Sequence, residues 1–170
     1  MDERNYVLIG FMGAGKTTVG KSLAKRLGAD FQDTDAWIER ETGLTVSAIF
    51  QEFGEEHFRL LETALVRKLS VSLQNTVLSV GGGLPIKKEN HFYLKNIGTV
   101  VYLEVSKETV MKRLSKDTTR PLLAGEPSEV SDRIKRLLQE RGPVYTALAD
   151  RVIAVDAFSV EEIVEQIISI

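Results

Sequence analysis

Hydrophobic residues along this chain follow two alternating patterns. Short runs with β-branched residues predict five strands, at 6–10, 30–35, 76–83, 99–105 and 151–155. Between them, apolar residues that recur at spacings of three and four predict amphipathic helices at 16–27, 55–73, 106–114, 128–140 and 160–168. Alternating strands and helices are typical of βαβ units, so we expect an α/β fold with a mostly parallel sheet covered by helices on both faces.

Two regions interrupt this alternation. Residues 35–58 hold two short helical patterns after the second predicted strand, and residues 116–127 are polar, with two prolines and one glycine. Long loops in compact domains often act as lids over a site, although a slack surface connection is an equally good interpretation. We therefore expect a mobile loop in the second region.

Composition narrows the class of protein. A chain of 170 residues, 43% hydrophobic and 27% charged, fits one domain with a substantial core. The formal net charge of -2 gives no global signature of nucleic-acid or anionic-membrane binding. The absence of cysteine excludes disulfides, thiolate metal sites and cysteine nucleophiles. With no apolar run near the roughly 20 residues of a membrane span, we expect a soluble, cytoplasmic protein.

The stretch "GFMGAGKTT", residues 10–18, lies between a predicted strand and a predicted helix. It matches G-x-x-x-x-G-K-[ST], a loop whose backbone N–H groups cradle nucleotide phosphates. Lys16 would add positive charge beside the phosphates, and the hydroxyl of Thr17 is suited to Mg²⁺. Because every motif position is filled in the required context, we predict nucleotide binding rather than a simple glycine-rich turn.

Other classes of nucleotide-binding protein fit less well. The chain has neither the D-x-x-G nor the N-K-x-D motif typical of a GTPase. A large mechanical ATPase would normally be longer and would carry an Asp at the end of a strand for the metal, whereas "TVLSV" continues into three glycines. A small kinase remains.

The second substrate should lie near the phosphate loop, beyond the carboxyl ends of the strands. Asp33 and Asp35 end the second predicted strand, and together they could hold a metal and accept a proton from an attacking hydroxyl. The three glycines at 81–83 could bring bare backbone N–H groups against a small polar ligand.

Three arginines could supply positive charge. Arg59 lies three residues before Glu62 on a predicted helix, so the carboxylate could orient the guanidinium, although a surface ion pair would look the same. Arg120 lies in the polar loop, and Arg141 is expected just after a helix. Either could stabilise a transferring phosphoryl group or bind the carboxylate of an acidic substrate.

The chain resembles the shikimate kinase family, small P-loop kinases of the pathway to aromatic amino acids, over nearly its whole length. The resemblance is carried by "GFMGAGKTTVGKSLA", "DTD", "IFQEFGEEHFRLLE", "VGGG", "TRPLL" and "ERGPVY", in the order and spacing of the family. It implies a three-layer α/β/α P-loop kinase fold with a five-stranded parallel sheet. Residues 1–170 would form one domain, with a helical substrate-binding segment at 33–61 and a mobile lid at 112–127.

The resemblance also implies a reaction, the Mg²⁺-dependent transfer of the γ-phosphate of ATP to the 3-hydroxyl of shikimate, which gives shikimate 3-phosphate and ADP. The implied catalytic residues are Lys16, Asp35 and Arg120, and the implied metal-binding residues are Thr17 and Asp33. The implied ATP-binding residues are Gly13, Ala14, Gly15, Lys16, Thr17, Thr18, Arg113 and Arg120. The implied substrate-binding residues are Asp35, Arg59, Gly81, Gly82, Gly83 and Arg141.

The resemblance implies only one side of the adenine site. Arg113 would stack on one side of the adenine, but the loop at 156–159, "DAFS", offers no recognisable family residue for the other side.

Two alternative functions accompany this interpretation. A related P-loop kinase acting on a sugar acid such as gluconate is the alternative enzyme. A silent nucleotide-binding regulator is disfavoured because the implied catalytic positions are all intact. We expect a monomer whose partners are small molecules, without nucleic acid or membrane.

Overall fold

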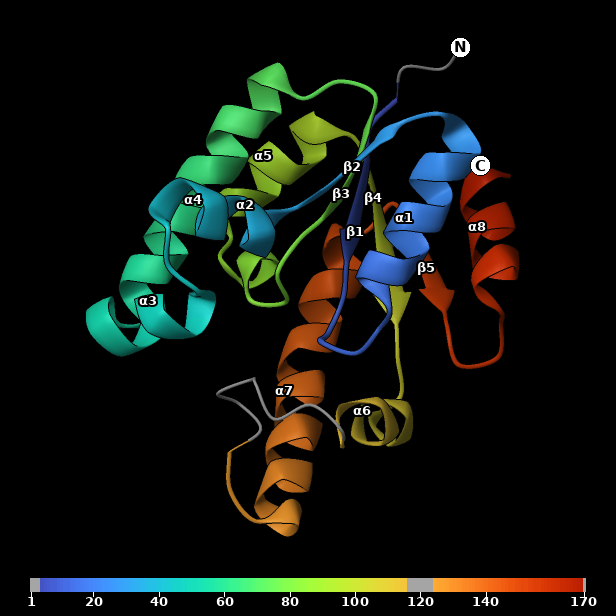
Figure 1. The fold of residues 1–170 in the computed structure, drawn as a ribbon. Coiled ribbons are helices and arrows are strands. Elements are labelled where there is room, and N and C mark those ends of the chain that lie inside the picture. Colours follow the sequence, from blue (N-terminus) through green and yellow to red (C-terminus); the bar gives the residue numbers. More distant parts are fainter. Residues whose placement is uncertain (1–3, 116–123, 170) are drawn as a thin grey trace.

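The protein is built around a parallel sheet of five strands (Figure 1). The computed structural model describes residues 4–115 and 124–169. The strand order is β2-β3-β1-β4-β5. The strands are β1 (Tyr6–Ile9), β2 (Asp30–Asp33), β3 (Thr76–Ser79), β4 (Thr99–Glu104) and β5 (Arg151–Ala154). All neighbouring pairs are parallel, so the carboxyl ends of the strands meet at one edge, as a doubly wound fold requires.

Helices cover both faces of the sheet and complete three layers (Figure 1). On one face lie α1 (Lys16–Leu27) and α8 (Val160–Ile168), and α6 (Lys107–Leu114) packs into the same part of the core from the carboxyl ends of the strands. On the other lie α2 (Thr34–Thr42), α3 (Val46–Phe53), α4 (Glu55–Ser72) and α5 (Glu89–Ile97), together with the short 3-10 helix η1 (Leu84–Ile86). The long helix α7 (Pro127–Leu148) contributes side chains to both layers. The predicted α/β fold is confirmed.

Alternation along the central strand divides the core into two parts. In β1, Leu8 packs with the α1 and α8 layer, whereas Val7 and Ile9 pack with the α4 and α5 layer. All four residues of β1 are buried, because successive side chains point to opposite faces and both faces are covered. A continuous apolar run is therefore what this strand requires.

Helix α7 corrects one expectation. The helix predicted at 128–140 continues to Leu148, so Arg141 lies within a helix rather than after one. The helix continues through Pro143, although proline cannot donate the usual backbone hydrogen bond. Tyr145 and Leu148 are buried, and their packing stabilises the added turns.

Two smaller differences concern the end of the third strand and the helix that comes after it. Strand β3 ends at Ser79, so the glycines at 81–83 lie in a turn that leads into η1, not in the strand. Helix α5 was not predicted, because its sequence "ENHFYLKNI" buries only three of its nine residues and leaves Phe92 exposed. No helix within the described ranges is long and apolar enough to cross a membrane.

Candidate active site

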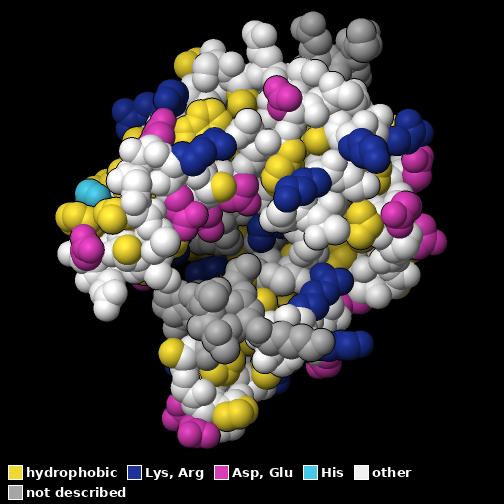
Figure 2. All heavy atoms as spheres, viewed as in Figure 1, with side chains coloured by type: hydrophobic (Ala, Val, Ile, Leu, Met, Phe, Trp, Pro, Cys, Tyr) yellow, Lys and Arg dark blue, Asp and Glu magenta, His cyan; other side chains and the backbone are white. Residues whose placement is uncertain are grey.

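A cleft of about 880 Å³ opens at the carboxyl edge of the sheet. It is lined by the loop between β1 and α1, by the start of α2, by α3 and α4, by the three glycines and by Arg141. Figure 2 shows acidic and basic side chains gathered around a hollow in this face of the molecule. The residues that line this cleft include the following predicted positions: Gly13, Gly15, Lys16, Thr17, Thr18, Asp33, Asp35, Arg59, Gly81, Gly82, Gly83 and Arg141.

The phosphate loop leaves the start of α1 open toward the cleft. Gly15 is the N-cap of α1 with φ of 90°, a left-handed conformation that glycine adopts without a Cβ clash. It has no side chain to cap the helix, so the first N–H groups remain available to an anion. The Nζ of Lys16 donates to the carbonyl oxygens of Gly10 and Phe11, at 2.8 and 3.0 Å, which holds the ammonium over the loop.

Thr17 and Asp33 could hold a metal between them. Both line the cleft, and Asp33 stands at the junction of β2 and α2, where one carboxylate oxygen accepts the backbone N–H of Ala36 at 3.1 Å. A hydroxyl and a carboxylate are hard oxygen donors, which suit a cation such as Mg²⁺ when phosphates and waters complete its shell. In the part of the chain that the structure describes, no group of three or more His, Cys, Asp or Glu side chains is arranged so that it could hold a metal ion. A hydroxyl and a carboxylate leave most of the shell of such a cation to the oxygens of a nucleotide and of water.

Asp35 lies in the first turn of α2, beside Glu62 of α4. One oxygen of Asp35 and one of Glu62 lie 2.9 and 3.0 Å from the point that a Cβ on Gly81 would occupy. A side chain at position 81 would displace one of the two carboxylates. Burial, and secondarily the charge of Asp35, raise the pKa of Glu62 to about 7, against the opposing effect of Arg59.

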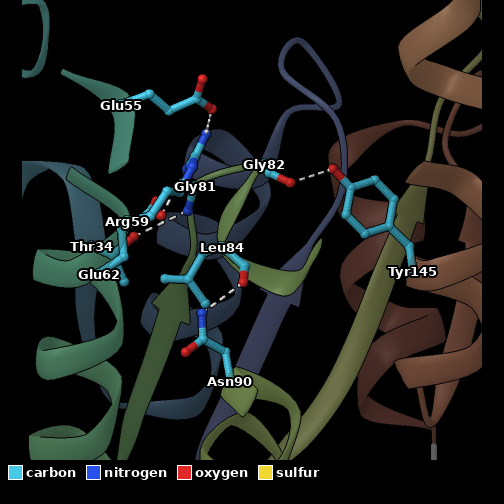
Figure 3. A network of polar contacts seen from close by, with 9 residues as sticks. All are labelled: Thr34, Glu55, Arg59, Glu62, Gly81, Gly82, Leu84, Asn90 and Tyr145. Atoms are coloured by element: carbon cyan, nitrogen blue, oxygen red, sulfur yellow. Dashed lines mark hydrogen bonds and ion pairs between the residues drawn. The ribbon is translucent and has the colours of Figure 1, made fainter. Parts of the chain in front are cut away.

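Arg59 is held by carboxylates on its own helix (Figure 3). It donates to buried Glu62 at 2.7 Å and to exposed Glu55 at 3.2 Å. Burial opposes the charge of Arg59, but these two carboxylates more than compensate and raise its pKa. A Cβ on Gly83 would clash with the guanidinium, so the glycine turn is what allows Arg59 to reach the cleft. The predicted pairing of Arg59 with Glu62 is confirmed, and the pair is not a surface pair, since Glu62 is buried.

Arg141 reaches the cleft from α7 and meets the glycine turn there. Its Nη1 and the hydroxyl of Tyr145 both lie 3.4 Å from the point that a Cβ on Gly82 would occupy. Tyr145 is buried, and its hydroxyl donates to the carbonyl of Gly82 at 2.5 Å (Figure 3). Sequence reasoning missed Tyr145. Its spacing of four residues from Arg141 would have shown it only if α7 had been predicted to continue.

A second cavity, of about 310 Å³, adjoins the phosphate loop on its other side. Gly13, Ala14, Gly15 and Thr18 line it, together with Arg113, Phe158 and several aliphatic side chains. Arg113 donates to the carbonyl of Gly13 at 2.7 Å, so the end of α6 is tied to the loop. Phe158 is 42% exposed although it is a large apolar residue. The apolar side chains that line this cavity suit a flat ligand group with apolar faces.

Asp156 joins the elements that carry the two walls of this cavity. It accepts the backbone N–H and the hydroxyl of Ser106, both at 3.1 Å, at the start of α6. Burial opposes ionisation, but hydrogen bonds from Thr109 and Ser106 more than offset it and lower the pKa of Asp156. The loop with Phe158 is thus fixed relative to the helix with Arg113. Sequence reasoning did not single out Phe158, and an apolar aromatic in a short loop before a helix is only a weak signal.

The sequence-predicted residues fall into two adjoining cavities, with one exception. Ala14 lines only the smaller cavity, and Arg113 lines only that cavity. Arg120 lies outside the described residues, as do residues 116–123, which make up half of the predicted lid at 112–127. The phosphate loop borders both cavities, so a ligand with a flat base at one end and phosphates at the other could lie along it.

Comparisons with known proteins agree with this geometry. The family model described as shikimate kinase matches residues 12–170. A shikimate kinase of Thermodesulfovibrio yellowstonii is 45% identical over 97% of this chain and 93% of the relative. One of Thermobifida fusca is 47% identical over 95% of this chain and 91% of the relative.

Solved structures of shikimate kinases are also similar to this chain. The structure of shikimate kinase from Acinetobacter baumannii in complex with shikimate superposes with a TM-score of 0.92, at 38% identity, over 99% of this chain and 92% of that one. The structure of shikimate kinase from Aquifex aeolicus gives a TM-score of 0.79 at 34% identity, over 97% and 94% of the two chains. With a family model, near full-length relatives and solved structures in agreement, this chain belongs to the shikimate kinase family.

Proposed function

We propose that this chain transfers the γ-phosphoryl group of ATP to the 3-hydroxyl of shikimate, with the donor and the acceptor in the two adjoining cavities. One cleft brings together the phosphate loop, the glycine turn, the carboxylates of Asp33 and Asp35 and the guanidinium groups of Arg59 and Arg141. This placement is the observation that carries the proposal. A carboxylate-bearing polyol needs both cationic groups and hydrogen-bond acceptors, and this cleft offers them beside a phosphate site.

The donor half is formed by the phosphate loop and the smaller cavity. The N–H groups at the start of α1 and the ammonium of Lys16 bind the phosphates. The adenine lies in the smaller cavity, between Arg113 of α6 and Phe158 of the loop between β5 and α8. Stacking between a guanidinium and an aromatic ring holds a base by its faces. Phe158 thus fills the position for which the sequence suggested no residue.

The acceptor half is formed by Arg59, Arg141, the glycine turn and Asp35. The two guanidinium groups approach the turn from α4 and α7 and bind the substrate carboxylate. Asp35 binds ring hydroxyls, orients the reacting one and accepts its proton as the bond to phosphorus forms. The bond between the γ-phosphorus and the bridging oxygen of ADP then breaks, and ADP leaves with the electron pair.

The metal and the lid belong to the same proposal. Mg²⁺, if held by Thr17 and through water by Asp33, would neutralise charge on the phosphates. Arg120, outside the described residues, is proposed from the family resemblance to stabilise the transferring phosphoryl group. The monomeric state and the cytoplasmic location of the protein remain predictions.

An ADP-release assay with purified protein tests the proposal. We expect shikimate-dependent ADP formation that requires Mg²⁺ and is at least tenfold weaker with gluconate as acceptor. Lys16→Ala should abolish turnover, because the loop then lacks its charge at the β and γ phosphates. Equal or faster turnover with gluconate would favour the alternative kinase, and ATP binding without any acceptor-dependent turnover would contradict the proposal.

A further inference from the structure

One buried hydroxyl connects two groups that the proposed function assigns to the acceptor. Tyr145 is fully buried, on the helix that carries Arg141, and its ring packs against that of Tyr102 in β4 at a centroid distance of 5.1 Å. The hydroxyl extends to the glycine turn, where it donates to the carbonyl of Gly82 (Figure 3). A buried tyrosine needs such a partner, so this contact alone would fit a packing role.

The direction of this hydrogen bond has a consequence for the next residue. The carbonyl of Gly82 and the N–H of Gly83 belong to one peptide plane and point in opposite directions, since the described chain has no cis peptide. Fixing the carbonyl on Tyr145 therefore directs the Gly83 N–H to the other side of the turn, where Arg59 lies (Figure 3). Among the residues that the structure describes, neither the Gly82 N–H nor the Gly83 N–H donates to a protein acceptor. The Gly83 N–H is thus an amide donor held in a fixed direction on a wall of the cleft, next to the Gly82 N–H.

The same hydroxyl faces Arg141. The Nη1 of Arg141 and the Tyr145 oxygen lie at equal distances, 3.4 Å, from the Cβ position of Gly82, one helical turn apart on α7. Because the hydroxyl proton is donated to Gly82, the oxygen lone pairs remain for the guanidinium. Burial raises the pKa of Tyr145 to about 12, against the effect of Arg141, so the hydroxyl keeps its proton at neutral pH.

We propose that Tyr145 is a positioning residue for the acceptor subsite: its hydroxyl sets the orientation of the Gly82–Gly83 peptide and supports Arg141, so that both face one ligand. The inference rests on the proposed function, because that function assigns these groups to shikimate. Flexible glycines gain most from such an anchor, since without it they populate many backbone conformations. Tyr145 itself does not touch the substrate.

The test is Tyr145→Phe, which keeps the ring and removes the hydroxyl. We expect the KM for shikimate to rise about three- to tenfold, the scale of one lost hydrogen bond, while the KM for ATP stays within twofold. The change should appear in the shikimate KM more than in kcat. The matched control is Tyr102→Phe, which removes a hydroxyl from the stacked ring without touching the glycine turn. An unchanged shikimate KM, or an equal rise in both KM values, would overturn the proposal.

A second measurement does not depend on turnover. In an amide NMR spectrum of the ligand-free proteins, Tyr145→Phe should shift the Gly83 resonance and Tyr102→Phe should not. In the wild-type protein, added shikimate should shift the Gly82 and Gly83 resonances, and their constancy would contradict the inference. If the wild-type protein lacked shikimate-dependent turnover, the proposed function would fail, whereas a ligand-free Gly83 shift would still report the anchoring by Tyr145.

Discussion

At the scale of single residues, the site depends on charges that are buried together. Glu62 lies between Arg59, to which it is paired at 2.7 Å, and Asp35; burial, and to a lesser extent the charge of Asp35, raise the pKa of Glu62. Burial of a carboxylate is costly unless it is paired, and here the pairing is incomplete because one Glu62 oxygen has no hydrogen-bond partner among the described residues. Glu62 therefore has two opposing effects: it orients Arg59 toward the substrate, and its buried charge lowers the stability of the folded protein.

This conflict predicts how stability depends on pH. Because the pKa of Glu62 is raised to about 7 in the folded protein, the folded state binds this proton more tightly than the unfolded state does. The contribution is fully present below the ordinary carboxyl pKa and is lost as pH rises toward 7. Glu62→Gln should remove this loss, so that the free energies of unfolding of wild type and variant diverge by up to about 1.4 kcal/mol per pH unit in this range.

Urea unfolding of the ligand-free protein from pH 4.5 to 8 measures this divergence. Glu56→Gln, an exposed carboxylate on the same helix, is the control for a change of surface charge. A constant difference between Glu62→Gln and wild type across the range would show that the pKa of Glu62 is not raised.

At the scale of elements, the loops at the carboxyl ends of the strands hold residues of the proposed site, and the helices orient them. The loop between β5 and α8 has two restraints: Asp156 bonds to the start of α6, and Ser159 and Glu162 form a capping box at the start of α8. Phe158 lies between these two restraints. A partly exposed aromatic ring on a restrained loop can receive a flat ligand with little loss of conformational entropy.

Phe158→Ala should therefore weaken the binding of ATP specifically. Stacking of a base on an aromatic ring is worth about 1–3 kcal/mol, so the KM for ATP should rise about fivefold or more while the KM for shikimate changes little. Steady-state kinetics with each substrate varied in turn will measure both. Phe92→Ala, which removes an exposed ring of α5 outside both cavities, should change neither constant. An unaltered ATP KM in Phe158→Ala would place the adenine elsewhere.

At the scale of the whole molecule, a buried polar residue that stabilises the sheet and the proposed active site lie at opposite ends of the strands. Asn5 precedes β1 and lies buried at the amino ends of the strands. Its side-chain amide donates to the carbonyls of Leu73 and Ile97, at 2.8 and 2.9 Å, and accepts the backbone N–H of Thr76 at 2.9 Å. This residue joins β1 to the segments before β3 and β4, far along the strands from the cleft.

Asn5→Ala should consequently lower stability without altering the site. Two buried backbone groups and one part-buried group would lose their partners, and we expect a loss of about 2–4 kcal/mol, equivalent to a Tm lower by about 5–15 °C. Calorimetry checks the stability, and kinetics should show both KM values within twofold of wild type. Asn96→Ala, at an exposed position of α5, is the control. A large change in either KM would mean that the two edges of the sheet are coupled.

Local patterns determined much of this protein by themselves. The alternation of short strand-like runs and amphipathic stretches predicted five strands and the α/β class. The runs of β1 and β4 are nearly continuous and apolar because these strands are buried on two faces. The phosphate loop was recognisable because its glycines, Lys16 and Thr17 act within one short segment. Arg59 and Glu62 could be paired because they are neighbours on one helix.

Only the tertiary structure decided which distant residues share the site. Packing of Tyr145 and Leu148 carries α7 past Pro143, which local propensity alone would not favour, and so places the Tyr145 hydroxyl at Gly82. Phe158 lines a cavity with Arg113 because Asp156 bonds to Ser106, fifty residues away in the chain. Such contacts join residues that are far apart in sequence, so no local pattern records them, and they form only when the sheet brings its carboxyl-end loops together.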